Sequence, residues 1–315
     1  MSKPRILLTC GDPNGVGPEI ALKILNNSSL NSIYDLSLII PESVAEHYSK
    51  TLKIKRLPNQ SLINIPDLNF KVKEGKNDKK AGRISGDAIH IGTELCMRKM
   101  HDALVTLPIS KKSFNLAGYQ FPGHTEYLKA ITGSERTIMI MYSESLVITP
   151  VTIHIPLKRV SFELEKSVLK KNLLLLHKTL VENFKISKPK IAVLSMNPHS
   201  GDGGLLGYEE KTKLEPVVKD LSGKGILVSG PYPADGFFGS GTYEKFDAVA
   251  GCYHDQALIP FKLLSKGSGV NLTAGLPIIR TSPTHGTAFD IAGKNIAKLE
   301  STISAIKLAA KLSAK

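Results

Sequence analysis

The sequence predicts an α/β protein with a largely parallel sheet and helices on both of its faces. Short apolar runs typical of buried strands alternate with longer stretches of helical periodicity. Clusters of glycine, proline and histidine follow several of the apolar runs, at the strand ends where open α/β sheets bind ligands. The 315 residues are enough for one large domain or two domains of medium size.

The expected elements alternate along most of the chain. Strands are expected at residues 5–10, 36–40, 103–106, 190–195, 225–228 and 247–250. Helices are expected from the first turn to about residue 26, from residue 41, and at 84–100, 162–184 and 295–314. The longest of these places Leu169, Leu173, Leu176 and Leu180 on one face, which is the pattern of a helix packed on a core.

The composition excludes few classes of protein. A net charge of +13 keeps nucleic-acid binding open as a minor alternative, but aromatic residues are only 6% of the chain and no nucleic-acid motif is present. A positive field also suits anionic small molecules. No run approaches the roughly 20 apolar residues that span a bilayer. The three scattered cysteines and an N-terminus without a secretory pattern predict a cytoplasmic protein.

Three histidines lie just beyond expected strands. They are His154, His199 and His254, and the last stands in the polar cluster Tyr253-His-Asp-Gln256. Histidine is the commonest ligand of zinc-type metals, and catalytic metal sites typically use three protein ligands. Their spacing matches no metal-binding signature, so hydrogen-bonded structural histidines remain the alternative. The shared strand-end position favours a metalloenzyme.

A glycine-rich turn, Gly11-Asp-Pro-Asn-Gly-Val-Gly-Pro-Glu19, joins the first strand to the first helix. Its spacing fits neither the dinucleotide fingerprint nor the P-loop. Asp12 and Asn14 favour a loop that lines a ligand site over a purely structural turn.

Two further groups of residues are candidates for binding an anion. His124 and Thr125 stand at the expected start of a helix, where free N–H groups attract negative charge. Capping of the helix by either residue is the alternative. Lys262, Asn271 and Arg280 recur at equal spacing and have the chemistry to hold a phosphate. Arg280 ends an apolar run, and its charge would be costly to bury without an anion.

Six blocks of sequence, in order along the chain, resemble the 4-hydroxythreonine-4-phosphate dehydrogenase (PdxA) family of pyridoxal 5′-phosphate biosynthesis. They are the glycine-rich turn, Gly123-His-Thr-Glu126, Asn197-Pro-His-Ser-Gly-Asp-Gly-Gly204, Gly230-Pro-Tyr-Pro-Ala-Asp-Gly-Phe-Phe238, Tyr253-His-Asp-Gln256 and Arg280-Thr-Ser-Pro-Thr-His-Gly-Thr-Ala288.

The resemblance implies a fold similar to isocitrate and isopropylmalate dehydrogenases, with two α/β domains flanking a cleft. The expected division is residues 1–130 plus 295–315 for the first domain and 131–294 for the second. It also implies a homodimer whose active site is shared between subunits, because in the family the third metal-binding histidine comes from the partner. His154, His199 and His254 match the metal ligands, and the metal would be zinc, magnesium or cobalt.

The resemblance also assigns the remaining site residues and the reaction. Substrate contacts carry over to His124, Thr125, Lys262, Asn271 and Arg280, and Asp235 matches an active-site acid. His285, Gly286 and Asp290 are expected to contact the NAD or NADP cofactor. The implied reaction oxidises 4-phosphooxy-L-threonine to a 3-oxo acid that loses CO2, with Asp235 or His124 taking the hydroxyl proton. A dehydrogenase of another four-carbon hydroxy-acid phosphate, such as erythronate or threonate, and a phosphate acyltransferase are the alternatives.

Overall fold

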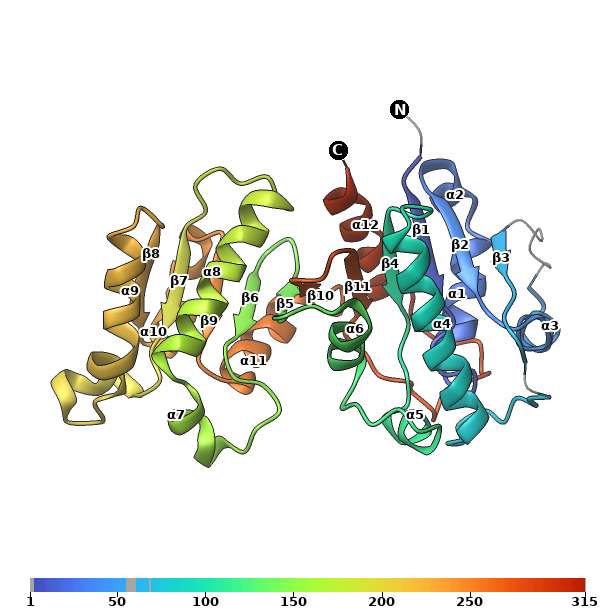
Figure 1. Cartoon of the computed structure of the whole chain (residues 1–315), viewed down its shortest axis with the longest axis horizontal. Helices are drawn as coiled ribbons and strands as arrows, with labels where there is room; N and C mark the ends of the chain where they lie inside the picture. Colours follow the sequence, from blue (N-terminus) through green and yellow to red (C-terminus); the bar gives the residue numbers. More distant parts are fainter. Residues whose placement is uncertain (1–2, 55–60, 68, 315) are drawn as a thin grey trace. The chain divides into compact units, whose positions relative to one another are not determined.

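The structure is a computed structural model that describes residues 3–54, 61–67 and 69–314 (Figure 1). Contacts within the chain divide it into two compact units. Unit 1 comprises Met1–Thr137 and Val270–Lys315, and unit 2 comprises Ile138–Gly269. Each unit is a sheet with helices packed against it, so the predicted α/β class is confirmed.

The two units share the discontinuous form of the predicted domains, with both ends of the chain in unit 1. They differ from that division in two segments. Residues 131–137 and 270–294 belong to unit 1, whereas the sequence analysis assigned them to the second domain. The second of these segments forms strands of the unit 1 sheet.

Unit 1 is built on a sheet in the order β3-β2-β1-β4-β11-β10. Its strands are β1 (Arg5–Thr9), β2 (Asp35–Ile39), β3 (Leu62–Ile63), β4 (Ala103–Thr106), β10 (Val270–Ala274) and β11 (Ile279–Pro283). Neighbouring strands run parallel except β10 and β11, which are antiparallel. Its helices are α1 (Gly17–Leu25), α2 (Ser28–Ile33), α3 (Glu42–Thr51), α4 (Lys79–Met97), α5 (Lys111–Leu116), α6 (His124–Thr132) and α12 (Glu300–Ser313).

The core of unit 1 lies between this sheet and the helices α4 and α12, which pack against β1 and β4. Ile6, Leu7 and Leu8 are fully buried, because a central parallel strand is covered on both faces. Helix α4 begins before the predicted residue 84, since the side chain of Asp78 caps it by accepting hydrogen bonds from the backbone N–H groups of Lys80 and Ala81.

Within unit 2 the strands follow the order β5-β6-β9-β7-β8. Its strands are β5 (Ile138–Tyr142), β6 (Val147–Pro150), β7 (Ile191–Leu194), β8 (Val228–Tyr232) and β9 (Ala248–Gly251). Its helices are α7 (Val160–Glu163), α8 (Lys166–Glu182), α9 (Glu215–Ser222), α10 (Ala234–Gly239) and α11 (His254–Ser265). The strands β6, β9, β7 and β8 are parallel, so their carboxyl ends lie at one edge of the sheet.

Two expected elements of unit 2 were wrong in their bounds. The strand predicted at residues 225–228 instead begins at Val228, because Gly225 has a φ of 84° in the turn that precedes it. The helix predicted at 162–184 is divided into α7 and α8, since the backbone leaves the helical conformation at Leu164. The predicted leucine face of α8 is confirmed as buried.

No helix in the described part of the chain is both long enough and apolar enough to cross a membrane.

Candidate active site

Arg280 is the most unusual residue of unit 1, because its charged side chain is only 1% exposed in the middle of the sheet. Its Nε and Nη2 donate to the Oγ1 of Thr106 on β4, and its Nη1 donates to the Oγ1 of Thr273 on β10 at 2.8 Å. Among the described residues, no carboxylate forms an ion pair with it. Burial lowers the pKa of Arg280 to about 9, which still leaves it charged at neutral pH.

The pairing of β10 with β11 brings Asn271 to the same side of the sheet as this guanidinium. Asn271 pairs with Ser282 and Leu272 with Thr281, so Thr273 stands opposite Arg280. Side chains two apart on a strand face the same way, which places Asn271 on the face of Thr273. The Oδ1 of Asn271 is buried and has no hydrogen-bond partner among the described residues.

His124 is the first residue of α6, and its Nε2 is also buried without a partner in the described part of the chain. Burial, together with the positive charge of Arg280, holds the pKa of His124 well below its usual value. The N-cap residue Gly123 supplies no side-chain hydrogen bond, so neither His124 nor Thr125 caps the helix. The first turn of α6 therefore presents free N–H groups beside a neutral imidazole.

These side chains of unit 1 form one polar group that is incomplete without an anion or another hydrogen-bonding ligand. A buried cation with only hydroxyl partners attracts a negative charge. The free Oδ1 of Asn271 and Nε2 of neutral His124 are acceptors, which suit donor groups of the same ligand. The other two predicted contacts, Lys262 on α11 and Asp235 in the first turn of α10, belong to unit 2. Lys262 and Asp235 are both exposed.

In unit 2, two of the predicted metal ligands lie together. β6 and β9 are adjacent parallel strands, with Pro150 paired to Gly251, and His154 and His254 follow their carboxyl ends. The two imidazole rings are 6.0 Å apart between centroids. Both line a cavity of ≈ 250 Å³ together with Thr152, Ile155, Leu157, Val160, Tyr253 and Asp255.

The hydrogen bond of His254 suits a metal ligand. Its Nδ1 lies 2.7 Å from the Oδ1 of Asp255, so a proton held there leaves the lone pair of Nε2 available. A carboxylate behind a ligating imidazole is the usual support for such a ligand, because it fixes the ring and raises its basicity. The residues present therefore fit a divalent metal of the zinc type.

His199 stands after β7, the strand on the other side of β9, within a 3-10 segment, η3 (Pro198–Gly204). Both His199 and His154 have left-handed backbones, with φ of 50° and 52°. Left-handed conformations are rare for residues with a Cβ and gather at functional sites. No group of three or more potential metal-binding side chains is found within the described residues, so the three histidines do not form one cluster within a single chain.

The predicted cofactor residues lie on the loop between β11 and α12. His285 has its Nδ1 3.0 Å from the carbonyl of Gly286, while its Nε2 is buried and unpartnered within the described chain. Gly286 and Asp290 are exposed. The loop packs on the glycine-rich turn, since Val16 N–H donates to the carbonyl of Thr287 and a Cβ on Gly15 would lie 2.9 Å from the same oxygen.

The glycine-rich turn itself is more structural than its sequence indicates. Asn14 is fully buried, and its side chain donates to the carbonyl of Lys76 and accepts from the N–H of Lys73. The buried Glu19 accepts from the N–H of Ala297 and so fixes the loop that carries the predicted cofactor residues. Asn14 therefore supports neighbouring loops and does not face a ligand.

Sequence reasoning missed two residues of the anion group, Thr106 and Thr273, which orient Arg280. Threonine is common in strands, and neither residue stands in a recognisable motif. Only the pairing of β4, β11 and β10 identifies them.

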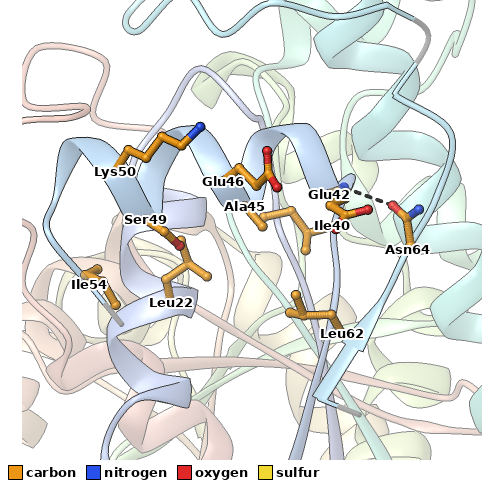
Figure 2. A pocket seen from close by; sticks show the side chains of 10 residues that line it. All are labelled: Leu22, Ile40, Glu42, Ala45, Glu46, Ser49, Lys50, Ile54, Leu62 and Asn64. Atoms are coloured by element: carbon orange, nitrogen blue, oxygen red, sulfur yellow. Dashed lines mark hydrogen bonds between the residues drawn. The ribbon is translucent and has the colours of Figure 1, made fainter. Parts of the chain in front are cut away.

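A separate cavity of ≈ 460 Å³ lies among α1, α3, β2 and β3 of unit 1, and none of the predicted site residues line it (Figure 2). Its floor is apolar, with Leu22, Ile40 and Leu62, and Glu42 donates its backbone N–H to the Oδ1 of Asn64 at its rim.

Comparison with known proteins identifies the family. The model of the family described as "Pyridoxal phosphate biosynthetic protein PdxA" matches residues 8–309, which is nearly the whole chain. The chain belongs to the PdxA family. The family resemblance stated from the six sequence blocks is thereby confirmed.

Relatives in this family are similar over their full length. A 4-hydroxythreonine-4-phosphate dehydrogenase of Bacteroides thetaiotaomicron is 39% identical, covering 98% of this chain and 88% of the relative. The solved structure of the 4-hydroxythreonine-4-phosphate dehydrogenase of Klebsiella pneumoniae superposes with a TM-score of 0.87 at 32% identity, covering 99% of this chain and 100% of the other. A terephthalate 1,2-cis-dihydrodiol dehydrogenase of Burkholderia xenovorans gives a TM-score of 0.68 at 25% identity, covering 98% of each chain.

The lowered pKa of His124 makes a prediction about stability at acid pH. An unfolded chain takes up a proton as the pH falls through the ordinary value near 6.5, whereas native His124 stays neutral. The unfolded state then binds more protons, so stability falls as the pH is lowered from 6.5 towards 5. Replacing His124 by Gln should make this decline shallower in urea unfolding at pH 5, 6 and 7.

Burial also lowers the pKa of His101, which therefore makes the protein less stable at acid pH as well. The loss of stability in the His124→Gln protein should therefore be smaller than in the wild type but not absent. His90 is exposed and its Gln variant serves as the matched control, with the wild-type decline expected. A decline in the His124→Gln protein as steep as that of the wild type would contradict a buried, neutral His124.

Proposed function

We propose that this member of the PdxA family is a 4-hydroxythreonine-4-phosphate dehydrogenase that requires a divalent metal and NAD or NADP. Its substrate would be 4-phosphooxy-L-threonine, and its product a 3-oxo acid that loses CO2 to give 3-amino-2-oxopropyl phosphate in vitamin B6 biosynthesis. The activity named for the full-length relatives supports this proposal. The structural observation that supports it most is the buried Arg280, whose positive charge is not compensated by a carboxylate among the described residues.

The anion that suits unit 1 is the phosphate of the substrate. Arg280 would donate to it from a guanidinium already oriented by two threonine hydroxyls. Thr125 and the free N–H groups at the start of α6 would add donors, as helix N-termini do for phosphates. Asn271 would bind from the neighbouring strand through its Nδ2, which is a donor. Lys262 on α11 stays a predicted substrate contact. Holding the phosphate fixes the secondary alcohol for reaction.

The metal would be held by His154, His199 and His254, with Asp255 orienting His254 through its Nδ1. When bound, a divalent cation lowers the pKa of a coordinated hydroxyl and polarises the ketone that forms. Because the three histidines do not form one cluster among the described residues of a single chain, we propose that a homodimer completes the site, with one of them supplied by the partner subunit.

A base must take the hydroxyl proton as hydride leaves the same carbon. His124 is neutral, because burial and Arg280 lower its pKa, and its Nε2 has an unused lone pair. Asp235, at the start of α10, is the second candidate for this base. His285, Gly286 and Asp290 would contact the nicotinamide cofactor, which accepts the hydride. The unpartnered Nε2 of His285 is an acceptor suited to such a contact.

Exposed apolar side chains near the three histidines support the homodimer. Ile259 and Leu263 are 60% and 72% exposed on one face of α11, the helix that begins at His254. Leu157 is 71% exposed beside His154, and Leu205 is 80% exposed directly after the His199 loop. Large apolar side chains exposed on a single chain are typical of interfaces, and the second copy needed for the third histidine is the partner proposed.

All three cysteines are free and buried, as a reducing compartment allows. A cytoplasmic location therefore remains part of the proposal.

The direct test of the proposed function is NADH or NADPH formation from 4-phosphooxy-L-threonine. Turnover should disappear after EDTA treatment and return with zinc, magnesium or cobalt, because the metal activates the hydroxyl. The His254→Ala variant should lose at least about 100-fold in kcat, because the substitution removes a metal ligand together with its hydrogen bond to Asp255.

Metal-independent turnover, or near-normal kcat in the His254→Ala variant, would contradict the metal assignment. Turnover of erythronate 4-phosphate or threonate 4-phosphate in place of 4-phosphooxy-L-threonine would keep the site chemistry but replace the substrate. The dihydrodiol dehydrogenase at 25% identity makes this comparison necessary, because it has the same fold and a different named substrate.

The homodimer has its own test. A Leu263→Glu variant should sediment as a monomer in analytical ultracentrifugation and lose turnover, because a buried charge at an interface is not tolerated. The matched control is Leu174→Glu on α8, which is 40% exposed and away from the histidines in sequence. A wild-type protein that sediments as a monomer, or a Leu263→Glu protein that remains dimeric, would contradict this assignment.

A further inference from the structure

The loop that carries His199 has a backbone that its own sequence does not favour. His199, Ser200, Gly201, Asp202 and Gly203 all have positive φ, from 42° to 78°. Only the two glycines adopt this region without a steric penalty. Five left-handed residues in succession persist only where their surroundings enforce them.

The side chain of Glu210 forms hydrogen bonds to the start of this loop. It is 1% exposed and begins a short π-helical turn, η4 (Glu210–Leu214). Its Oε1 accepts from the backbone N–H groups of Met196 and Asn197 at 2.8 and 2.7 Å, and its Oε2 accepts from the Nδ2 of Asn197 at 3.0 Å. A carboxylate is the one side-chain group that can accept all three hydrogen bonds.

The same carboxylate also meets the far side of the loop. A Cβ at Gly201 would lie 2.8 Å from the Oε2 of Glu210, so the glycine backbone packs directly on it. Glu210 thus contacts the chain before His199, at residues 196 and 197, and after it, at residue 201. No ion pair of Glu210 occurs among the described residues, and its hydrogen bonds are to N–H groups of Met196 and Asn197.

We infer that Glu210 is a positioning residue that fixes the left-handed backbone of His199 for metal binding. This inference rests on the proposed function, which makes His199 a metal ligand. Glu210 touches no predicted ligand, substrate or cofactor residue except through the loop. Its effect should therefore appear in metal affinity and in the protection of the loop, and not in the anion site of unit 1.

The test is the Glu210→Gln variant, which keeps the size of the side chain. Its amide oxygen can still accept from Met196 and Asn197, but its NH2 would face the Nδ2 of Asn197, donor against donor. We expect the zinc dissociation constant, measured by competition with a chromophoric chelator, to rise by about 10- to 100-fold, as for other residues that support metal ligands. Backbone N–H groups 196 and 197 should exchange with solvent faster.

The matched control is the Glu215→Gln variant, because Glu215 is an exposed carboxylate at the start of α9. This variant should bind zinc like the wild type. Circular dichroism and binding of inorganic phosphate show whether the variants are folded and unit 1 is intact. A Glu210→Gln protein with a zinc dissociation constant within about twofold of the wild type would overturn the inference. A wild-type protein that binds no zinc would instead refute the proposed metal site, and the inference with it.

Discussion

A buried positive charge without a negative partner is the constraint on which unit 1 depends. Arg280 lies in β11, between β4 and β10, and both neighbouring strands contribute a threonine hydroxyl to its guanidinium. Hydroxyls orient the charge but do not neutralise it, and an uncompensated buried charge costs several kcal/mol, about 3–5 in measured cases. The unpartnered atoms of Asn271 and His124 lie in the same polar group. An anion would compensate the charge of Arg280, and donor groups of the same ligand would satisfy the other two atoms, which accept hydrogen bonds.

Unit 2 depends on a different constraint, the left-handed backbones of His154 and His199. Each costs roughly 1–2 kcal/mol relative to an ordinary helical or extended conformation. The chain holds the His199 loop with the carboxylate of Glu210 and with the hydroxyl of Ser200, which donates to the carbonyl of Pro231. Two of the three candidate metal ligands thus keep a strained backbone. Such strain is typical of functional sites that must hold a side chain in one defined position.

The sequence was sufficient for the α/β class, the family and most of the early strands, because apolar runs and motif blocks are local signals. It was insufficient where an element is defined by its neighbours. Strands β10 and β11 were not predicted, since Gly275, Pro277 and polar residues interrupt the apolar pattern on which strand prediction rests. For the same reason Thr106 and Thr273 were missed, because only strand pairing brings them to Arg280.

The central claim is that Arg280 holds the phosphate of the substrate. Titration calorimetry with 4-phosphooxy-L-threonine and with unphosphorylated 4-hydroxy-L-threonine tests it most directly, in the wild type and in a folded Arg280→Ala variant. The wild type should prefer the phosphorylated compound by about 10- to 100-fold, which corresponds to ~1.5–3 kcal/mol for hydrogen bonds to a charged group, and the variant should lose that preference. Equal affinity of the wild type for both compounds, or an unchanged preference in the variant, would contradict the account.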